Sequence, residues 1–243
     1  MKFTNVFDSN YTKSIDQGLK SYILSVYKYV ALGLLMTGFS AFITMSFSPF
    51  TNLVFNIQGG VIYGFTGLGT IIGLSPIFIG IYFFWGFGSI SIEKAKVLFW
   101  VYAFAVGVST SSIGFIYTGQ SIFRTFFITA SAFGLMSIYG YKTKKDLTSL
   151  ASMFTMVLLG VLFVSLINIF LGNSMLYFLT SILGVIAFMG LIAWNTQKIK
   201  SVYYNHGGGE LAQKYAVMSA FQLYLDFINL FFYLIRFFGY KKD

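Results

Sequence analysis

Long apolar runs separated by short polar breaks dominate the hydrophobicity pattern of this chain. A helix that spans a bilayer needs about 20 mostly apolar residues. Seven segments meet this requirement: 23–46, 69–90, 97–118, 122–140, 151–171, 175–195 and 215–238. The second contains Pro76, and because helix bundles in membranes tolerate proline, we expect a helix that starts before Pro76 and kinks there. The Gly-rich stretch 47–68 is predicted to be an outer loop or a partly embedded segment.

Composition leads to the same class of protein. The 243 residues are 57% hydrophobic and 9% charged, whereas soluble domains usually carry about 25% charged residues. The predicted fold class is therefore an all-α integral membrane protein, a bundle of seven transmembrane helices. We expect a polar N-terminal tail, 1–22, which lacks the apolar segment that is typical of a signal peptide. A single transmembrane domain, 23–240, follows it.

The distribution of lysines predicts the topology. The loops 47–68, 119–121 and 172–174 contain no Lys or Arg, whereas the breaks at the other end of the spans are rich in lysine. Since positively charged loops remain in the cytoplasm, we expect a multi-pass protein with a cytoplasmic N-terminus. Seven crossings would place Lys241 and Lys242 outside. A last segment that enters and returns would instead put both termini inside.

Several functional classes are not expected. The net charge of +9 does not indicate nucleic acid, because the basic residues lie in short clusters between apolar runs. Cysteine is absent and His206 is the single histidine, which excludes disulfides, thiolate chemistry and multi-histidine metal sites. The stretch HGGGE, 206–210, lacks the strand, Lys and Ser or Thr of a phosphate-binding loop, and we interpret it as a cytoplasmic turn. No constellation of catalytic residues is visible, so we expect neither enzymatic activity nor a cofactor.

The most unusual position is Asp226, inside the apolar run LYLDFINLFFYLIRFFG, 223–239. It lies roughly 15 Å from either end of its span, at about 1.5 Å per helical residue, which is too deep for its carboxylate to reach the interface. Four polar residues share its helical face at spacings of three and four: Ser219, Gln222, Asn229 and Tyr233. A polar stripe is unfavourable against lipid, so we expect this helix inside the bundle or beside a watery cavity, with Asp226 as a functional group. The alternative is a neutral Asp226 that only joins helices by hydrogen bonds.

Other polar residues in the spans have simpler interpretations. Arg124 and Arg236 lie near span ends and are predicted to extend to the interface. The run Ser109 to Ser112 is predicted to mark close helix packing. Asn195 belongs to AWNTQKIK, where the helical pattern can continue to about Tyr203, on a side that could meet the final helix.

Together these motifs resemble a known family. AWNTQKIK followed by LYLDFINLFFYLIRFFG, and earlier FITASAFGLMSIYGYKTKKDL and LINIFLG, are similar to the bacterial branch of the Bax inhibitor (transmembrane Bax inhibitor motif) family. The resemblance covers nearly the whole chain from about residue 20. It implies a compact bundle of seven helices in the bacterial plasma (inner) membrane, with the last helix central and wrapped by the other six. It also implies a proton-sensitive calcium leak.

One position departs from the family pattern. In the family, a carboxylate in the sixth-helix motif shares a proton with the carboxylate of the final helix, which couples pH to pore opening. Asp226 matches the second of these, but the first position holds Asn195, whose amide does not titrate. The like-charge interaction that separates the pKa values of a carboxylate pair is therefore absent, and we expect pH gating to be weakened or shifted. Calcium affinity should also fall, because the neutral Asn195 replaces one anionic oxygen ligand and leaves Asp226 as the candidate calcium ligand.

Three functions remain open at this point. The first is a pH-modulated calcium leak channel, with Asp226 and Asn195 on the ion path and calcium as the transported ion. The second, implied by the resemblance to bacterial relatives, is a quality-control factor that binds a membrane-bound protease through the tail 1–22. The third is a structural bundle with a vestigial site.

Overall fold

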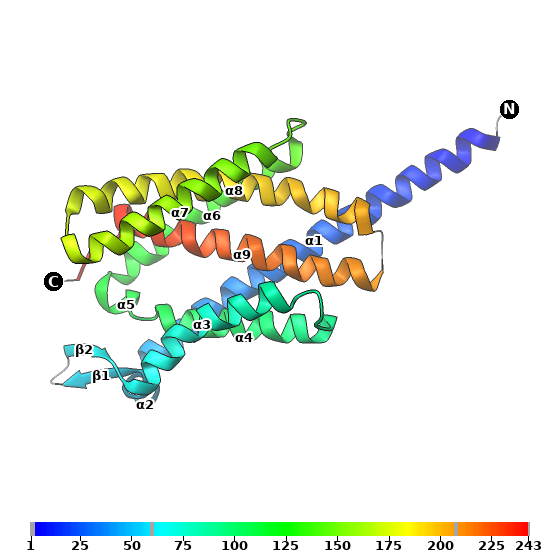
Figure 1. Cartoon of the computed structure of the whole chain (residues 1–243). Coiled ribbons are helices and arrows are strands. Elements are labelled where there is room, and N and C mark those ends of the chain that lie inside the picture. The colour runs from blue at the N-terminus through cyan, green and yellow to red at the C-terminus, as the bar shows by residue number, and fades with distance from the viewer. Residues whose placement is uncertain (1–2, 59–60, 207–208, 243) are drawn as a thin grey trace.

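The computed structural model describes residues 3–58, 61–206 and 209–242. Seven of its helices are long and apolar enough to cross a membrane, namely α1, α3, α4, α6, α7, α8 and α9. The predicted fold class, an all-α bundle with seven membrane-spanning helices, is confirmed (Figure 1). The elements are, in chain order, α1 (Phe3–Ser46), α2 (Ser48–Val54), β1 (Phe55–Gln58), β2 (Val61–Phe65), α3 (Gly67–Gly86), α4 (Ile92–Thr110), α5 (Ile113–Ile116), α6 (Gly119–Lys142), α7 (Thr148–Leu171), α8 (Ser174–His206) and α9 (Glu210–Phe238).

The first three spans begin or end at residues other than those predicted. α1 is one continuous helix, so the division into a tail 1–22 and a domain 23–240 falls inside it and stays a prediction. α3 starts before Pro76, as expected, but ends at Gly86. α4 begins earlier than expected because the Ser91 hydroxyl accepts a hydrogen bond from the backbone N–H of Lys94 and caps the helix.

The stretch 47–68 contains regular structure that was not predicted. α2 carries Pro49 in its first turn, where a missing N–H costs no hydrogen bond. β1 and β2 then pair as an antiparallel hairpin. Val54 and Phe55, at the start of the hairpin, form a small buried cluster with Val108 of α4. The sequence signal for this hairpin is the Gly-Gly pair between two runs rich in β-branched and aromatic residues.

α9 is the central helix, as the family resemblance implies (Figure 1). One hydrophobic cluster joins it to α1, α6 and α8, and a second joins it to α3 and α4. In the second cluster the ring of Phe221 stacks on that of Phe83 of α3, with centroids 4.2 Å apart. The Tyr224 hydroxyl lies 2.6 Å from the Thr37 hydroxyl of α1, which donates to the Ala103 carbonyl of α4 at 2.9 Å. Close packing on all sides therefore fixes the position of α9.

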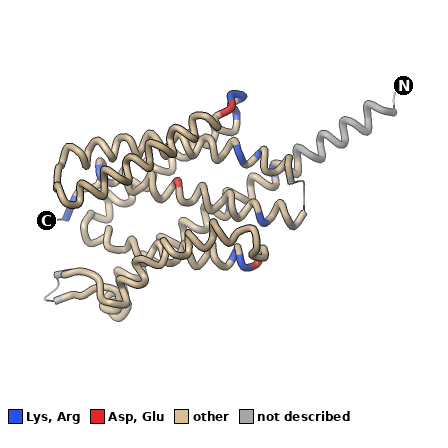
Figure 2. The backbone as a smooth tube through the Cα atoms, in the orientation of Figure 1, with Lys and Arg blue, Asp and Glu red and all other residues tan. Residues whose placement is uncertain are grey.

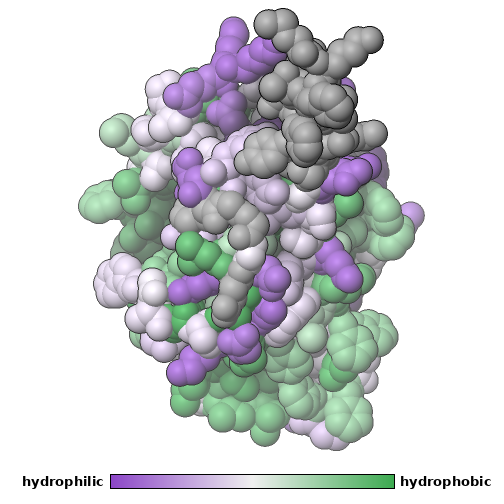
Figure 3. Space-filling model, turned by 90° about the vertical axis from the view of Figure 1, so that its right-hand side faces the viewer, coloured by the Kyte–Doolittle hydropathy of each residue, from purple (hydrophilic) through white to green (hydrophobic). Residues whose placement is uncertain are grey.

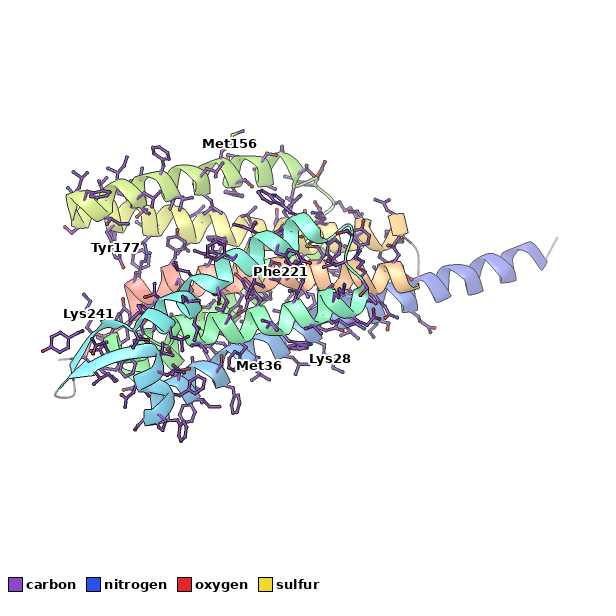
Figure 4. All side chains as sticks on the ribbon, turned by 60° about the horizontal axis from the view of Figure 1, so that its bottom comes forward. Lys28, Met36, Met156, Tyr177, Phe221 and Lys241 are labelled. Atoms are coloured by element: carbon purple, nitrogen blue, oxygen red, sulfur yellow. The ribbon has the colours of Figure 1, made fainter. Side chains whose placement is uncertain are left out.

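The periphery of the bundle is apolar. α7 packs against α8 on the outside of the bundle rather than on α9, and its Met156 points away from the other helices (Figure 4). The two buried clusters show that α1, α3, α4, α6 and α8 pack on the last helix, whereas α7 packs mainly on α8. Elsewhere on the outside, Trp85 is 88% exposed and Phe170 is 90% exposed. Apolar surface of this extent is disfavoured in water and favoured in lipid.

Most charged residues lie toward the two ends of the bundle, with one acidic residue in its middle (Figure 2). Figure 3 looks onto one of these ends, where hydrophilic side chains lie on the face and hydrophobic ones on its flanks. We call this the lysine-rich end. Its lysines, among the side chains that the structure describes, include Lys20, Lys94, Lys96, Lys142, Lys144, Lys145, Lys198, Lys200 and Lys214.

The C-terminal residues lie at the opposite end of the bundle (Figure 1). There Lys241 forms an isolated β-bridge with Tyr117, and the Lys242 amine donates to the Gly114 carbonyl at 2.6 Å. Since α9 is a continuous helix of 29 residues, the alternative in which the last segment enters and returns is wrong. That the lysine-rich end faces the cytoplasm stays a prediction.

Candidate functional site

The candidate site lies in the antiparallel pair formed by α8 and α9 (Figure 1). Of the turn predicted at HGGGE, Gly207 and Gly208 lie outside the described residues. Gly209 precedes α9 with a φ of 119°, a conformation that side-chain-bearing residues rarely adopt. The turn thus lets α9 run back along α8 and brings residues 31 positions apart in sequence into contact.

Asp226 and Asn195 meet in the interior of this pair. The Asn195 amide nitrogen, Nδ2, donates to Asp226 Oδ2 at 2.6 Å. Their exposed fractions are 6% for Asp226 and 8% for Asn195. Asp226 follows the start of α9 at Glu210 and precedes its end at Phe238, about 24 Å and 18 Å away at 1.5 Å per residue. The structure therefore brings together the two residues that the sequence singled out, deep in the membrane-spanning part.

The amide of Asn195 can bind Asp226 in either protonation state. Its N–H donates to an ionised carboxylate, whereas its carbonyl oxygen can accept from a protonated carboxyl group after the amide turns over. That oxygen, Oδ1, is buried and has no hydrogen-bond partner among the described residues. A second carboxylate at this position would instead need a shared proton, because two close carboxylates do not both ionise readily.

The residues that follow Asn195 make contacts that the sequence analysis did not predict. Consecutive residues of a helix project about 100° apart, so each of them meets a different neighbour. The Thr196 hydroxyl lies 3.1 Å from the hydroxyl of Tyr27 of α1. Gln197 accepts from the Leu147 amide at 3.0 Å and donates to the Lys145 carbonyl at 2.7 Å. The run therefore ties α8 to α9, to α1 and to the loop before α7, and these contacts hold Asn195 in place.

The other members of the polar stripe do not join the pair. Ser219 is buried and Gln222 is half-buried, and among the described residues no hydrogen bond links either to Asp226. Asn229 donates to the Leu225 carbonyl of its own helix at 2.8 Å. Tyr233 packs its ring near Phe188 of α8, with centroids 5.8 Å apart. The stripe therefore faces α8 at Asp226 and at Tyr233, inside the bundle.

Both arginines and the hydroxyl run have clear environments. Arg124 is exposed, in keeping with an interfacial position. Arg236 is half-buried: its guanidinium lies 4.6 Å from the Tyr177 ring centroid and donates to the Ser181 hydroxyl at 3.2 Å. The prediction that Arg236 merely extends to the interface left out these partners on α8. In the hydroxyl run, Ser109 donates to the Gly73 carbonyl of α3 at 3.0 Å, which fits the predicted close packing.

The chemistry of the site limits how it could hold a cation. The described residues contain no group of three or more His, Cys, Asp or Glu side chains that could hold a metal ion. Calcium prefers six to eight oxygen ligands. The Asp226 carboxylate and the unpartnered Asn195 oxygen would supply few of these, so a calcium ion at the site would retain most of its water. Such a site is suited to brief contact rather than to tight binding.

Comparison with known proteins identifies relatives along nearly the whole chain. The sequence model of the family described as "Inhibitor of apoptosis-promoting Bax1" matches residues 19–243. An uncharacterized protein of Rickettsia prowazekii is 53% identical over 231 residues, which cover 95% of this chain and 94% of the relative. An uncharacterized protein of Caulobacter vibrioides is 39% identical over 231 residues, covering 95% and 92%. The inner membrane protein YbhL of Escherichia coli K12 is 37% identical over 232 residues, covering 93% and 94%.

Proposed function

The chain belongs to the Bax inhibitor family of multi-pass inner-membrane proteins, and from this premise we propose that it is a calcium leak channel whose ion path passes Asp226. Calcium is the transported ion and not a resident cofactor. The path runs along α9, between the lysine-rich end, which we place in the cytoplasm, and the opposite end of the bundle.

One observation carries this proposal: Asp226, 6% exposed in the middle of the central helix, lies next to a buried amide oxygen that has no hydrogen-bond partner among the described residues. Ionisable groups in such positions are costly and commonly mark ion or proton pathways. A stabilising role alone is a weak explanation, because hydrogen bonds between membrane helices contribute only about 0.6 kcal/mol on average.

We further propose that Asn195 weakens the pH response of this leak. The hydrogen bond between Asn195 and Asp226 can persist when Asp226 gains or loses a proton, since the amide has both a donor and an acceptor. The proton therefore does not switch a repulsive pair into an attractive one, as it would between two carboxylates. Flux should accordingly change less steeply with pH than in a protein that has both carboxylates.

The experiment is calcium flux into liposomes that contain the purified full chain, measured from pH 5 to 8. We expect wild type to conduct calcium and Asp226→Asn, which removes the charge at constant size, to lose most of this flux. Asp146→Asn is the matched control, because Asp146 is exposed in the loop between α6 and α7, and it should conduct like wild type. Equal flux in wild type and Asp226→Asn would overturn the proposal.

The alternative, binding to a membrane-bound protease, makes the opposite prediction. It depends on the N-terminal tail rather than on Asp226. Since Leu19 and Tyr22 are buried in the bundle, the deletion to use is 1–16 rather than 1–22. A leak survives this deletion, whereas a protease-binding role does not. Folded wild-type protein without calcium flux would favour the alternative.

A further inference from the structure

A crevice of about 440 Å³ opens between α1 and α6 at the lysine-rich end. Both helices pack against α8 and α9, and they approach each other where the rings of Tyr27 and Phe133 lie 6.3 Å apart. The walls combine apolar side chains of both helices, among them Ile23, Leu24 and Ile138, with one lysine from each helix at the mouth. The crevice therefore has a charged entrance and an apolar interior.

The two lysines at the mouth are Lys20 of α1 and Lys142 of α6. Both are exposed, and within the described part of the chain neither amine has a hydrogen bond or ion pair. Other lysines of the same end are engaged by the protein. The Lys214 amine donates to the Gly88 carbonyl at 3.2 Å, and that of Lys198 lies 4.9 Å from the Trp194 ring centroid. Lys20 and Lys142 thus keep their hydrogen-bonding capacity for a ligand.

The length of the crevice fits one bilayer leaflet. On α1 the lining runs from Lys20 to Tyr27, which is about 10 Å of helix, and on α6 from Lys142 to Gly134, about 12 Å. One leaflet contributes about 15 Å of hydrocarbon. Gly134 adds width at the deep end, because a Cβ placed there would meet nothing within 4 Å. An extended hydrocarbon chain would therefore fit beside Gly134.

We propose that this crevice binds one anionic phospholipid, with its phosphate between Lys20 and Lys142 and one acyl chain along Ile23, Ile138 and Gly134. Basic pockets between transmembrane helices are suited to anionic headgroups. A free anion would use the two lysines alone and leave the apolar walls without a partner. Neither Asp226 nor Asn195 lines the crevice, so lipid binding there can be tested without changing either residue of the pair.

A second crevice, lined by residues of α1, α4, α5, α6 and α9, provides an internal comparison. It has a volume of about 450 Å³ and lies in the other half of the bundle. Its lining includes Leu34, Gly38, Phe42 and Phe126, and none of the described residues that line it is Lys or Arg. A Cβ on Gly38 would also meet nothing within 4 Å. Without a cationic mouth, this crevice should accept acyl chains with no preference for anionic lipid.

The test is native mass spectrometry of the full chain in detergent, titrated with phosphatidylglycerol and with phosphatidylcholine of identical acyl chains. We expect wild type to bind one phosphatidylglycerol more tightly than phosphatidylcholine. The double variant Lys20→Gln/Lys142→Gln should lose this preference, with affinity lowered about thirtyfold, or about fivefold per lysine at about 1 kcal/mol each. Gly134→Leu should weaken binding of the lipid while both lysines remain.

Matched controls make the result decisive. Lys94→Gln/Lys96→Gln removes two lysines that lie at the same end but outside the crevice, and Gly38→Leu fills the uncharged crevice. Both variants should keep the preference for phosphatidylglycerol over phosphatidylcholine. Thermal midpoints without added lipid verify that each variant folds. An equal loss in Lys94→Gln/Lys96→Gln would mean general surface attraction and would overturn the proposal. Displacement of the lipid by millimolar glycerol phosphate, or no effect of Gly134→Leu, would identify an anion site without an acyl chain and would overturn it as well.

Discussion

Two glycines of α6 provide a sharp test of the packing that positions the site. Gly140 faces the backbone of α8, where a Cβ would lie 2.8 Å from the carbonyl carbon and 2.9 Å from the Cα of Ala193. Ala193 is two residues before Asn195 in the same helix. Gly134, on the same helix, would place its Cβ in open space. Gly140→Ala and Gly134→Ala are therefore one chemical change in two opposite environments.

The expected magnitudes follow from these distances. Ordinary van der Waals contact begins at about 3.4 Å, so Gly140→Ala forces two backbones apart, and overpacking of this kind costs about 1–3 kcal/mol. Alanine also gains up to about 1 kcal/mol over glycine in a helix, and this gain is common to both variants. The difference in free energy of unfolding between them should therefore be about 1–3 kcal/mol, with Gly140→Ala the less stable.

The assay measures the thermal midpoint of unfolding of detergent-purified protein. After heating to each temperature, the protein that remains folded is quantified by size-exclusion chromatography. For a chain of this size, about 1 kcal/mol corresponds to about 2–4 °C. Gly134→Ala should match or slightly exceed wild type, and Gly140→Ala should fall below Gly134→Ala by about 2–12 °C. Equal midpoints for the two variants would refute the close approach of α6 and α8 at Gly140.

Three further predictions concern polar contacts. Asn195→Leu leaves the Asp226 carboxyl without its hydrogen-bond donor and should lower the thermal midpoint. The double variant Asn195→Leu/Asp226→Leu should recover most of that loss. A double variant that is no more stable than Asn195→Leu would contradict this prediction. Arg236→Gln loses its ring contacts and should cost about 1–2 kcal/mol of stability, measured as a midpoint shift that Arg124→Gln does not show. Hydrogen bonds from the Thr148 side chain and backbone lower the pKa of the exposed Asp146 carboxyl. Its stabilisation is therefore present above the unfolded pKa of about 4 and is lost as pH falls through the lower folded value. The midpoint difference between wild type and Asp146→Asn should accordingly be constant from pH 5 to 8 and vanish in stronger acid; a difference that changes near neutral pH would contradict the assignment.

Much of the fold follows from the sequence, because membrane spans are set by length and hydrophobicity. The spacing of the stripe around Asp226 also predicts that α9 is shielded from lipid, since a polar face inside a membrane must be covered, whereas its central position is what the family resemblance implies. The hairpin β1–β2 was missed because it is only nine residues of strand inside a segment that hydrophobicity alone does not resolve. The Gly-Gly pair between two runs rich in β-branched and aromatic residues is the signal that predicts this hairpin.

The partners within the site were harder to predict. Periodicity places Asp226 on a polar face, whereas the expectation that position 195 meets it across 31 residues came from the family resemblance and not from the spacing. The contact between Thr196 and Tyr27 spans 169 residues, and the contacts of Arg236 with α8 depend on the register of two helices. The crevice at Lys20 and Lys142 depends on the separation of α1 and α6. None of these distances is encoded in the local pattern of one segment.

The central claim is that Asp226 and Asn195 act as one site and that Asn195 sets its pH response. The most direct measurement is the pH dependence of calcium flux in liposomes, from pH 5 to 8, for wild type and Asn195→Asp, with Asn229→Asp as a control for an added carboxylate on the same stripe. The account predicts that Asn195→Asp makes the flux change more steeply with pH, while Asn229→Asp does not. Identical pH profiles for wild type and Asn195→Asp would contradict it.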